Sequence, residues 1–348
     1  MARFARGRIG ALGAKPRYPA RLFNYLAVKL VYRLGWIRAP FLPATLDIEP
    51  NNTCNFKCPH CQVPYWSKPA AFLDAERFAK ILRQAPHLVR IKLQGMGEPL
   101  LNKNLVGMLR LGEARGASMS FFSNGSALSD ETAAALAGLN DTEITFSLDG
   151  ASKETFERIR AGGNFEKVIE NVRRLVAARG AKREPVLSGW TLATAENVGE
   201  LARVVRLARE MGLDRLTIQT FLSDWGKEEM KARTGAHRIG QDSEALAASI
   251  REAEAAACEI GFDLRISRSD YYSRRSKCVW PWTSAYVAAN GDVVPCCVIA
   301  DSDTAKMGNV FERDFAKIWN SPAYRAFRQR IRDHDLPDYC RNCYIDPD

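Results

Sequence analysis

Apolar and polar residues follow two different patterns along the chain. Short stretches rich in β-branched and aromatic residues recur, and longer stretches with an apolar residue every three or four positions lie between them. The first pattern predicts β-strands and the second predicts amphipathic helices. We expect strands at 44–49, 90–94, 118–123, 142–148, 185–192 and 215–222. We expect helices near 74–85, 102–115, 129–138, 165–179, 196–211 and 243–260.

Regular alternation of strands and helices predicts parallel strands joined by right-handed crossovers. Six such units are fewer than the eight of a closed barrel. We therefore expect an α/β fold, with a partial (β/α)6 TIM-like barrel or an open sheet as its core. In both arrangements the ligand site lies at the carboxyl ends of the strands.

The pattern changes after about residue 265. The stretch AYVAANGDVVPCC (285–297) has two β-rich arms around Asn290-Gly291, a dipeptide favoured in type I′ hairpin turns. One helix is expected to follow at about 313–330. These elements predict a small α+β module, and the chain divides into an N-terminal extension (1–42), a core (43–265) and a C-terminal module (266–348).

Residues 20–38 have helical periodicity and a basic character. Nine Lys or Arg and no Asp or Glu occur in residues 1–40, and Lys29 and Arg33 interrupt the apolar run in a way that argues against a signal peptide. The helix could rest on an anionic membrane surface or bind an acidic partner, or it could pack against the body with its charges in solvent. Its apolar stripe comprises Phe23, Leu26, Leu30, Leu34 and Ile37.

Composition excludes several classes of protein. The hydrophobic content of 46% and the charged content of 26% are ordinary for a soluble protein, and no apolar run reaches the length of a membrane span. Nine of the ten net positive charges precede Asp47, so the body is nearly neutral and no nucleic-acid partner is expected. The nine cysteines cluster as metal ligands do. We expect a cytoplasmic location, with contact to the inner face of the membrane as an option for residues 20–38.

Three cysteines follow the first expected strand at C-x3-C-x2-C spacing: Cys54, Cys58 and Cys61. A structural zinc site wants four ligands, and His60 would have to bend back on a short loop to be the fourth. A disulfide between two of these cysteines would leave the third thiol unpaired. Three thiolates suit a [4Fe–4S] cluster, because they leave one iron open to a substrate or cofactor.

This loop resembles the cluster-binding loop of the radical S-adenosylmethionine (SAM) superfamily, over roughly residues 44–265. Met96-Gly97-Glu98-Pro99 follows the second strand and is similar to the family's Gly-Gly-Glu-Pro motif, with Met in the first place, and SLDG (147–150) follows the fourth strand. The resemblance implies that SAM binds the open iron and that an electron from the cluster cleaves it to a 5′-deoxyadenosyl radical. The implied SAM-binding residues are His60, Gly95, Met96, Gly97, Glu98, Ser123, Asn124 and Ser147.

The C-terminal cysteines resemble an auxiliary-cluster module of the same superfamily, in the shorter twitch form related to SPASM. The ligands of this second [4Fe–4S] cluster would be Cys278, Cys296, Cys340 and Cys343. A four-cysteine zinc ribbon is the alternative. Cys297 could replace Cys296, although the spacing to Gly291 favours Cys296. Full ligation of the cluster by four thiolates implies electron transfer.

Other residues are weaker candidates. Cys258 is expected to be a buried small hydrophobe, and His237 and His334 are expected to be ordinary surface residues. No catalytic acid or base is assigned. Residues that could cover the adenine, face the substrate or simply pack are Tyr65, Trp66, Trp190, Gln219 and Asp224.

The main functional expectation is radical-initiated oxidation of a substrate, with the second cluster accepting an electron. Alternatives are modification of a ribosomally made peptide, reaction on a lipid-linked substrate, and a non-catalytic metal-binding scaffold or sensor. The expected partners are a small-molecule or peptide substrate and an electron donor such as flavodoxin or ferredoxin.

Overall fold

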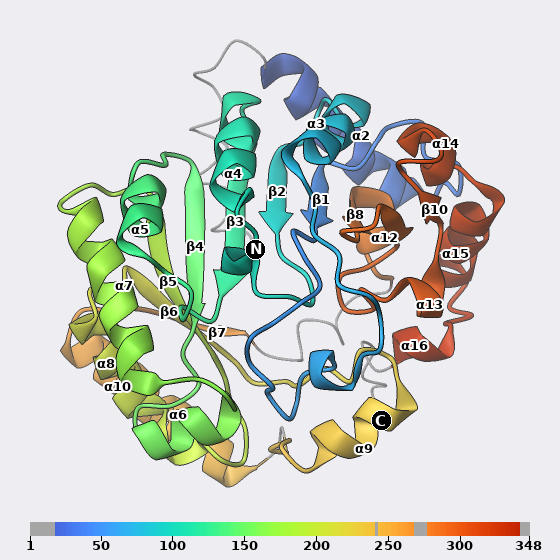
Figure 1. Ribbon diagram of the computed structural model, residues 1–348. Coiled ribbons are helices and arrows are strands. Elements are labelled where there is room, and N and C mark those ends of the chain that lie inside the picture. The colour runs from blue at the N-terminus through green and yellow to red at the C-terminus, as the bar shows by residue number, and fades with distance from the viewer. Residues whose placement is uncertain (1–17, 241–242, 268–276, 342–348) are drawn as a thin grey trace.

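The fold is built on one mixed sheet of ten strands, seen in the computed structural model, which describes residues 18–240, 243–267 and 277–341 (Figure 1). Along the sheet the strands follow the order β10-β9-β8-β1-β2-β3-β4-β5-β6-β7. Neighbours from β8 through β1 to β7 are parallel, and β9 and β10 are antiparallel. The strands are β1 (Thr45–Ile48), β2 (Arg90–Leu93), β3 (Ser118–Ser123), β4 (Thr142–Ser147), β5 (Val186–Leu192), β6 (Arg215–Gln219), β7 (Asp263–Ser267), β8 (Ser284–Val287), β9 (Asp292–Val294) and β10 (Gly308–Asn309).

Helices cover one face of this sheet, because one side of each strand is apolar. Along β6, Leu216 and Ile218 are fully buried, whereas Arg215, Thr217 and Gln219 are only partly buried. The inner face is therefore polar, and the outer face forms the core with the helices. The helices of the described residues are α2 (Tyr18–Leu34), α3 (Ala75–Gln84), α4 (Leu105–Ala114), α5 (Asp130–Ala137), α6 (Lys153–Ile159), α7 (Phe165–Arg179), α8 (Leu201–Glu210), α9 (Glu228–Gly235), α10 (Glu244–Glu259), α12 (Trp280–Thr283), α13 (Ser302–Ala305), α14 (Phe315–Trp319), α15 (Pro322–Arg332) and α16 (Asp338–Arg341), with short 3-10 turns at Val63–Tyr65, Pro99–Leu101 and Val198–Glu200. Helix α9 lies beyond the carboxyl ends of the strands (Figure 1).

The predicted α/β fold with a partial barrel is confirmed, and the sheet is wider than expected. All six predicted strands are present, and β7 and β8 add one parallel strand at each end of that set. β8 pairs with β1 in register Thr45↔Ser284. The C-terminal hairpin thus continues the sheet of the core. The sheet does not close within the described ranges, since β7 and β10 are its edges.

Two details of the C-terminal prediction are wrong. The hairpin turn is not type I′, because Gly291 has φ 91° while Asn290 is not among the residues with positive φ, and type I′ needs both. The single helix expected at 313–330 is two helices, α14 and α15. Ser321 caps α15 through Tyr324 N, and Pro322 occupies its first turn, where its missing N–H costs nothing.

Helix α2 packs on the body with a face that differs from its apolar stripe. Val28 and Val31 are buried, and the Tyr32 ring meets Trp282 of α12 at 5.7 Å between centroids. Phe23, Leu26, Leu30 and Leu34 are exposed. The expectation that α2 packs against the body is therefore correct, but the predicted stripe is not what it buries. Among the described helices, none combines the length and apolarity needed to cross a membrane.

Candidate functional site

The three N-terminal cysteines lie together on the loop after β1, at the carboxyl end of the sheet. Cys58 is buried, and Cys54 and Cys61 pack partly buried around the same small cluster of Phe56, Phe156 and Val168. The backbone turns tightly between them, since Cys61 N donates to Cys58 O at 3.0 Å. Phe56 N points at Cys54 Sγ at 3.4 Å, a contact that favours a thiolate there.

The electrostatics of this loop suit ligands that ionise only when a metal centre is present. Burial raises the pKa of the Cys61 thiol to about 12. Burial also raises the pKa of Cys54 and of Cys58. Binding iron would replace those protons, as thiolate ligation requires. The donor set therefore fits an iron–sulfur cluster. Among the described residues no three His, Cys, Asp or Glu side chains are arranged to hold a single metal ion.

Glu98 joins the loops that follow β2 and β3. Its buried carboxylate accepts hydrogen bonds from Ser123 Oγ (2.8 Å), Asn124 N (2.7 Å) and Leu100 N (3.0 Å). Its own N–H donates to Thr53 O at 2.8 Å, next to the first cysteine. Burial raises the pKa of Glu98 in spite of these bonds. Glu98 thus fixes three segments of the rim relative to one another.

The glycines of the β2 loop allow its close approach to the cysteine loop. A Cβ at Gly97 would collide with the carbonyl oxygens of Asn51 and Thr53, and a Cβ at Gly95 would collide with Glu49 and Tyr286. Gly97 N donates to Asn51 O at 3.2 Å. No larger residue fits either position without movement of the backbone or of buried side chains. The two loops therefore form one unit.

Asn124 connects this unit to the first cysteine. Its Nδ2 lies 3.9 Å from Cys54 Sγ and donates to Asn55 Oδ1 at 3.0 Å. Ser123 Oγ in turn accepts from Gly125 N at 2.9 Å. The structure thus brings together Gly95, Met96, Gly97, Glu98, Ser123 and Asn124 around the cysteine loop. Ser147 lies at the end of β4, partly buried, and takes no part in the Glu98 network.

Two charged residues near the cysteines were not predicted from the sequence. Arg160, after α6, donates to Asp149 through Nε at 2.5 Å, and its Nη1 lies 4.0 Å from Cys58 Sγ. Asp149 is wholly buried and also accepts from Leu192 N at 2.7 Å. In the sequence, Asp149 could have been identified as a site residue, because it lies within the SLDG motif. Arg160 places a positive charge beside a ligand that would be anionic.

His60 and His237 form a pair on one side of the cysteine loop. Their rings meet edge to face at 6.1 Å between centroids, and His237 Nδ1 is 2.6 Å from Glu196 Oε1. Burial, together with Arg160, lowers the pKa of His60 to about 3, so the ring is neutral. The prediction that His237 is an ordinary surface residue is wrong, because its side chain is only 17% exposed and contacts this site.

A second junction links the first cysteine set to the C-terminal module. Glu49, just after β1, accepts from Met96 N (2.9 Å), Tyr286 OH (2.8 Å) and Ala289 N (3.1 Å). Met96 accepts through sulfur from Gln62 Nε2 at 2.8 Å. It also packs, as Cys296 and Cys297 do, against one small apolar cluster around Tyr286. Met96 therefore lies between the two cysteine sets.

The C-terminal cysteines gather on the side of the sheet that carries β8 and β9. Cys278 and Cys340 pack partly buried against the main core, and Cys296 and Cys297 pack against the neighbouring cluster. Tyr339, next to Cys340, contacts both clusters. Cys343 lies outside the described residues. Cys258 is exposed on α10, so the expectation that it is buried is wrong: its position falls on the solvent side of that helix.

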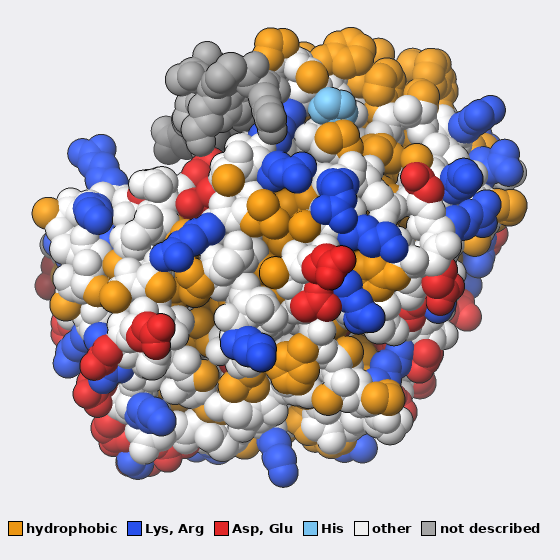
Figure 2. Space-filling view, turned by 45° about the horizontal axis from the view of Figure 1, so that its top comes forward, with side chains coloured by type: hydrophobic (Ala, Val, Ile, Leu, Met, Phe, Trp, Pro, Cys, Tyr) orange, Lys and Arg blue, Asp and Glu red, His pale blue; other side chains and the backbone are white. Residues whose placement is uncertain are grey.

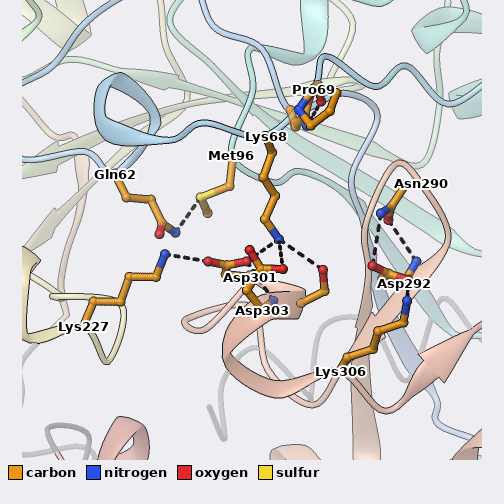
Figure 3. A network of polar contacts seen from close by, with 12 residues as sticks. Gln62, Lys68, Pro69, Met96, Lys227, Asn290, Asp292, Asp301, Asp303 and Lys306 are labelled. Atoms are coloured by element: carbon orange, nitrogen blue, oxygen red, sulfur yellow. Dashed lines mark hydrogen bonds and ion pairs between the residues drawn. The ribbon is translucent and has the colours of Figure 1, made fainter.

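A buried carboxylate joins three rim segments beside this region (Figure 3). Asp301 pairs with Lys68 of the cysteine-loop segment and with Lys227 before α9, each at 2.5 Å. Burial alone would raise the pKa of Asp301, but hydrogen bonds from Lys227 and Lys68 outweigh it and hold the pKa below its usual value. The Trp66 ring lies 5.3 Å from Lys68 Nζ and 5.6 Å from Lys227 Nζ. The C-terminal module is thereby tied to the mouth of the site.

The remaining candidates are placed as follows. Trp190 packs edge to face on Phe122 at 5.2 Å, on the inner face of the sheet. Gln219 donates to Phe221 O at 2.6 Å, and Asp224 is buried and paired with Arg238 at 3.3 Å. Tyr65 is exposed, and Arg233 Cζ lies over its ring, 3.9 Å from the ring centroid.

Two sequence profiles match the chain. Residues 48–208 match the radical SAM superfamily, and residues 278–344 match an iron–sulfur cluster-binding domain, SPASM. The first match spans the three-cysteine loop, and the second spans all five C-terminal cysteines, which include the four expected ligands. Together they imply a SAM-binding [4Fe–4S] cluster and auxiliary cluster chemistry.

Curated relatives and solved structures cover most of the chain. A tungsten-containing aldehyde ferredoxin oxidoreductase cofactor-modifying protein of Pyrococcus furiosus is 25% identical over 324 residues, covering 86% of this chain and 87% of that protein. The PqqA peptide cyclase of Gluconobacter oxydans is 27% identical over 316 residues, covering 87% and 83%. Streptococcus suis SuiB, solved with its precursor peptide SuiA, superposes with TM-score 0.68 at 18% identity, covering 86% of this chain and 70% of SuiB. At that identity the superposition shows the fold alone.

Proposed function

Because the chain belongs to the radical SAM superfamily and ends in an iron–sulfur cluster-binding domain, we propose that this radical SAM enzyme oxidatively modifies a peptide substrate. The observation that carries the proposal is the position of Met96 and Glu49 between the two cysteine sets. The class of substrate is supported by relatives of near full length that are PqqA peptide cyclases. The wider alternative is oxidation of a small molecule.

The two cofactors divide the chemistry. Cys54, Cys58 and Cys61 would hold a cluster that would supply the electron for cleavage of SAM. Cys278, Cys296, Cys340 and Cys343 would hold a second cluster, which would take up an electron from the substrate.

The chain's own residues position these groups. The Gly95–Glu98 loop would present backbone C=O groups to the ammonium group of SAM, since the N–H groups of Met96, Gly97 and Glu98 already donate to Glu49, Asn51 and Thr53. Ser147 is the last residue of β4 and the first of the SLDG motif. Arg160 would partly offset the negative charge of the ligated Cys58. Trp66, between Lys68 and Lys227, would limit the access of water to the mouth of the site.

The proposal includes a reducing location and a donor. Thiol ligands and a reduced cluster need a low-potential environment, which favours the cytoplasm. An electron donor such as flavodoxin or ferredoxin would deliver the first electron. Contact of residues 20–38 with the inner face of a membrane is part of the same proposal and depends on helix α2.

The proposal is tested with reconstituted enzyme, SAM and a chemical reductant under anaerobic conditions. We expect 5′-deoxyadenosine to form, and its rate to rise when peptide fractions of a cell extract are added but not when metabolite fractions are added. The stimulated product should be lighter than its precursor by two hydrogen atoms. If only the metabolite fraction stimulated the reaction, the substrate would be a small molecule and not a peptide. If no 5′-deoxyadenosine formed under any condition, the proposal of an enzyme would be wrong, and a non-catalytic scaffold or sensor would be favoured.

The role of the second cysteine set gives a separate prediction. Cys340→Ala should lower the iron content by about four per chain, one cubane cluster. Product formation should stop while 5′-deoxyadenosine still forms from SAM, because the first site is intact. Cys297→Ala is the matched control, expected to keep both the iron and the product. If Cys340→Ala formed the product at the wild-type rate, the proposed role of this cluster in accepting an electron would be wrong.

A further inference from the structure

Helix α2 presents a row of large apolar side chains to solvent. Phe23 is 63% exposed, and Leu26, Leu30 and Leu34 are 56%, 55% and 54% exposed. Trp36, just beyond the helix, is 51% exposed. Figure 2 shows hydrophobic side chains gathered along the top margin of the molecule, the side on which Figure 1 places α2. A continuous apolar row of this kind marks an interaction surface.

The row cannot turn inward, because α2 is already held on the body by its other face. Val28 and Val31 are buried, and Asn24 Nδ2 donates to Leu42 O at 3.1 Å. The chain beyond the helix is held as well: Trp282 Nε1 donates to Trp36 O at 2.8 Å, and Arg328 Nη1 donates to Ile37 O at 3.2 Å. The exposed row is therefore a fixed feature of the folded protein.

The charges carried by α2 and the segment after it have one sign. Lys29, Arg33 and Arg38 are exposed on α2 and the segment after it. The first acidic residue of the chain is Asp47, which is wholly buried in β1. Asp333 lies near the end of the row and is paired with Arg332 at 2.6 Å. An apolar row flanked by the cations of its own segment is complementary to a layer that has an apolar interior and an anionic surface.

We propose that α2 seats this protein on an anionic lipid bilayer. The row from Phe23 to Trp36 would enter the boundary between headgroups and acyl chains, and Lys29, Arg33 and Arg38 would lie among the anionic headgroups. A second copy of the chain fits less well, because pairing the two rows would bring these cations together.

This seating also sets the direction in which the site faces. Arg21 donates to Arg115 O, in the turn between α4 and β3, and Asn24 donates to Leu42 O, before β1. Helix α2 thus lies at the amino ends of the strands, and the cysteine loop lies at their carboxyl ends (Figure 1). A bilayer under α2 would meet the end of the sheet opposite the site. The substrate would then enter from the aqueous side, which disfavours a substrate buried in the lipid.

Flotation of the full chain with vesicles tests the proposal. Vesicles of phosphatidylcholine with phosphatidylglycerol should carry the protein, and vesicles of phosphatidylcholine alone should carry much less. Phe23→Ser/Leu26→Ser/Leu30→Ser should lower the partition at least about tenfold, because three apolar side chains no longer enter the bilayer. Lys29→Glu/Arg33→Glu should abolish the preference for anionic vesicles, and salt should weaken binding by the wild type.

The control is Phe72→Ser, the same chemical change at an exposed phenylalanine away from α2. It should float as the wild type does. All the replaced side chains are exposed, so circular dichroism should show unchanged folding. Three outcomes would overturn the proposal: no flotation of the wild type, equal flotation of the triple variant, or a wild-type dimer in sedimentation velocity that the triple variant converts to a monomer. The last would identify a second copy as the occupant.

Discussion

Replacement of Cys58 by alanine should abolish SAM cleavage while leaving the protein folded. Cys58 is the buried member of the three-cysteine loop and the one beside Arg160. Loss of one of three thiolates leaves a cluster too weakly held to survive purification. We expect 5′-deoxyadenosine formation to fall by about a thousandfold or more, equivalent to about 4 kcal/mol. Iron content should fall by about four per chain.

The exposed thiol of Cys258 provides the control for this change. Cys258→Ala removes a cysteine from the solvent side of α10 and should alter neither iron content nor cleavage. Both variants should melt within a few degrees of each other when the proteins are prepared without iron, since a small buried side chain is the only folding contribution lost at Cys58. If Cys58→Ala retained wild-type iron and cleavage, the three-cysteine loop would not be the SAM site.

The second large effect is expected for Glu98→Ala. This change leaves Ser123 Oγ, Asn124 N and Leu100 N without their acceptor in a buried place. Each buried donor without a partner costs about 1–3 kcal/mol. The loops after β2 and β3 should then move relative to the cysteines, and SAM cleavage should fall about 10- to 100-fold, as for other residues that orient ligands. Urea unfolding and the cleavage assay measure the two effects.

Glu113→Ala separates lost stability from lost positioning. Glu113 of α4 also accepts three hydrogen bonds, from Asn140 N (2.9 Å), Asp141 N (2.9 Å) and Thr142 Oγ1 (2.7 Å). These lie at the amino end of β4, far from the cysteine loop in the chain's topology. The variant should lose stability and keep its cleavage rate per folded molecule. Equal loss of cleavage in both variants would show that Glu98 acts only through global stability.

The fold was predictable where sequence pattern and local structure agree. β2, β3 and β6 bury alternate positions, as a strand with one buried face does. Helix α7 was predicted with its observed bounds, Phe165–Arg179. β7 was missed because DLRIS has no fully buried position and gains its structure by pairing with β6. The pairing of β8 with β1 joins segments more than 230 residues apart, and no local pattern carries that information.

The site was predictable where chemistry depends on spacing. Cys54, Cys58 and Cys61 are close in sequence, so their role follows from the loop that holds them. Arg160 could not be identified in this way, because its relevance depends on the path of the chain after α6, which returns it to Asp149 and Cys58. His237 reaches His60 by the same kind of long-range contact. The exposed row of α2 was seen as a stripe, but only the packing of Val28 and Val31 shows which face is free.

The continuity of the sheet from β1 into β8 has a consequence for catalysis. Parallel neighbours in a sheet are held about 4.8 Å apart by a ladder of backbone hydrogen bonds. The first cysteine loop follows β1, and Cys296 follows the β8–β9 hairpin. The hydrogen bonds between these strands therefore hold the starting points of the two cysteine-bearing segments at a fixed distance. The two redox centres would keep a constant separation, and a substrate would have to enter by movement of side chains and rim loops. We therefore expect turnover to respond to changes in the Lys68–Asp301–Lys227 contact more than to any hinge between domains.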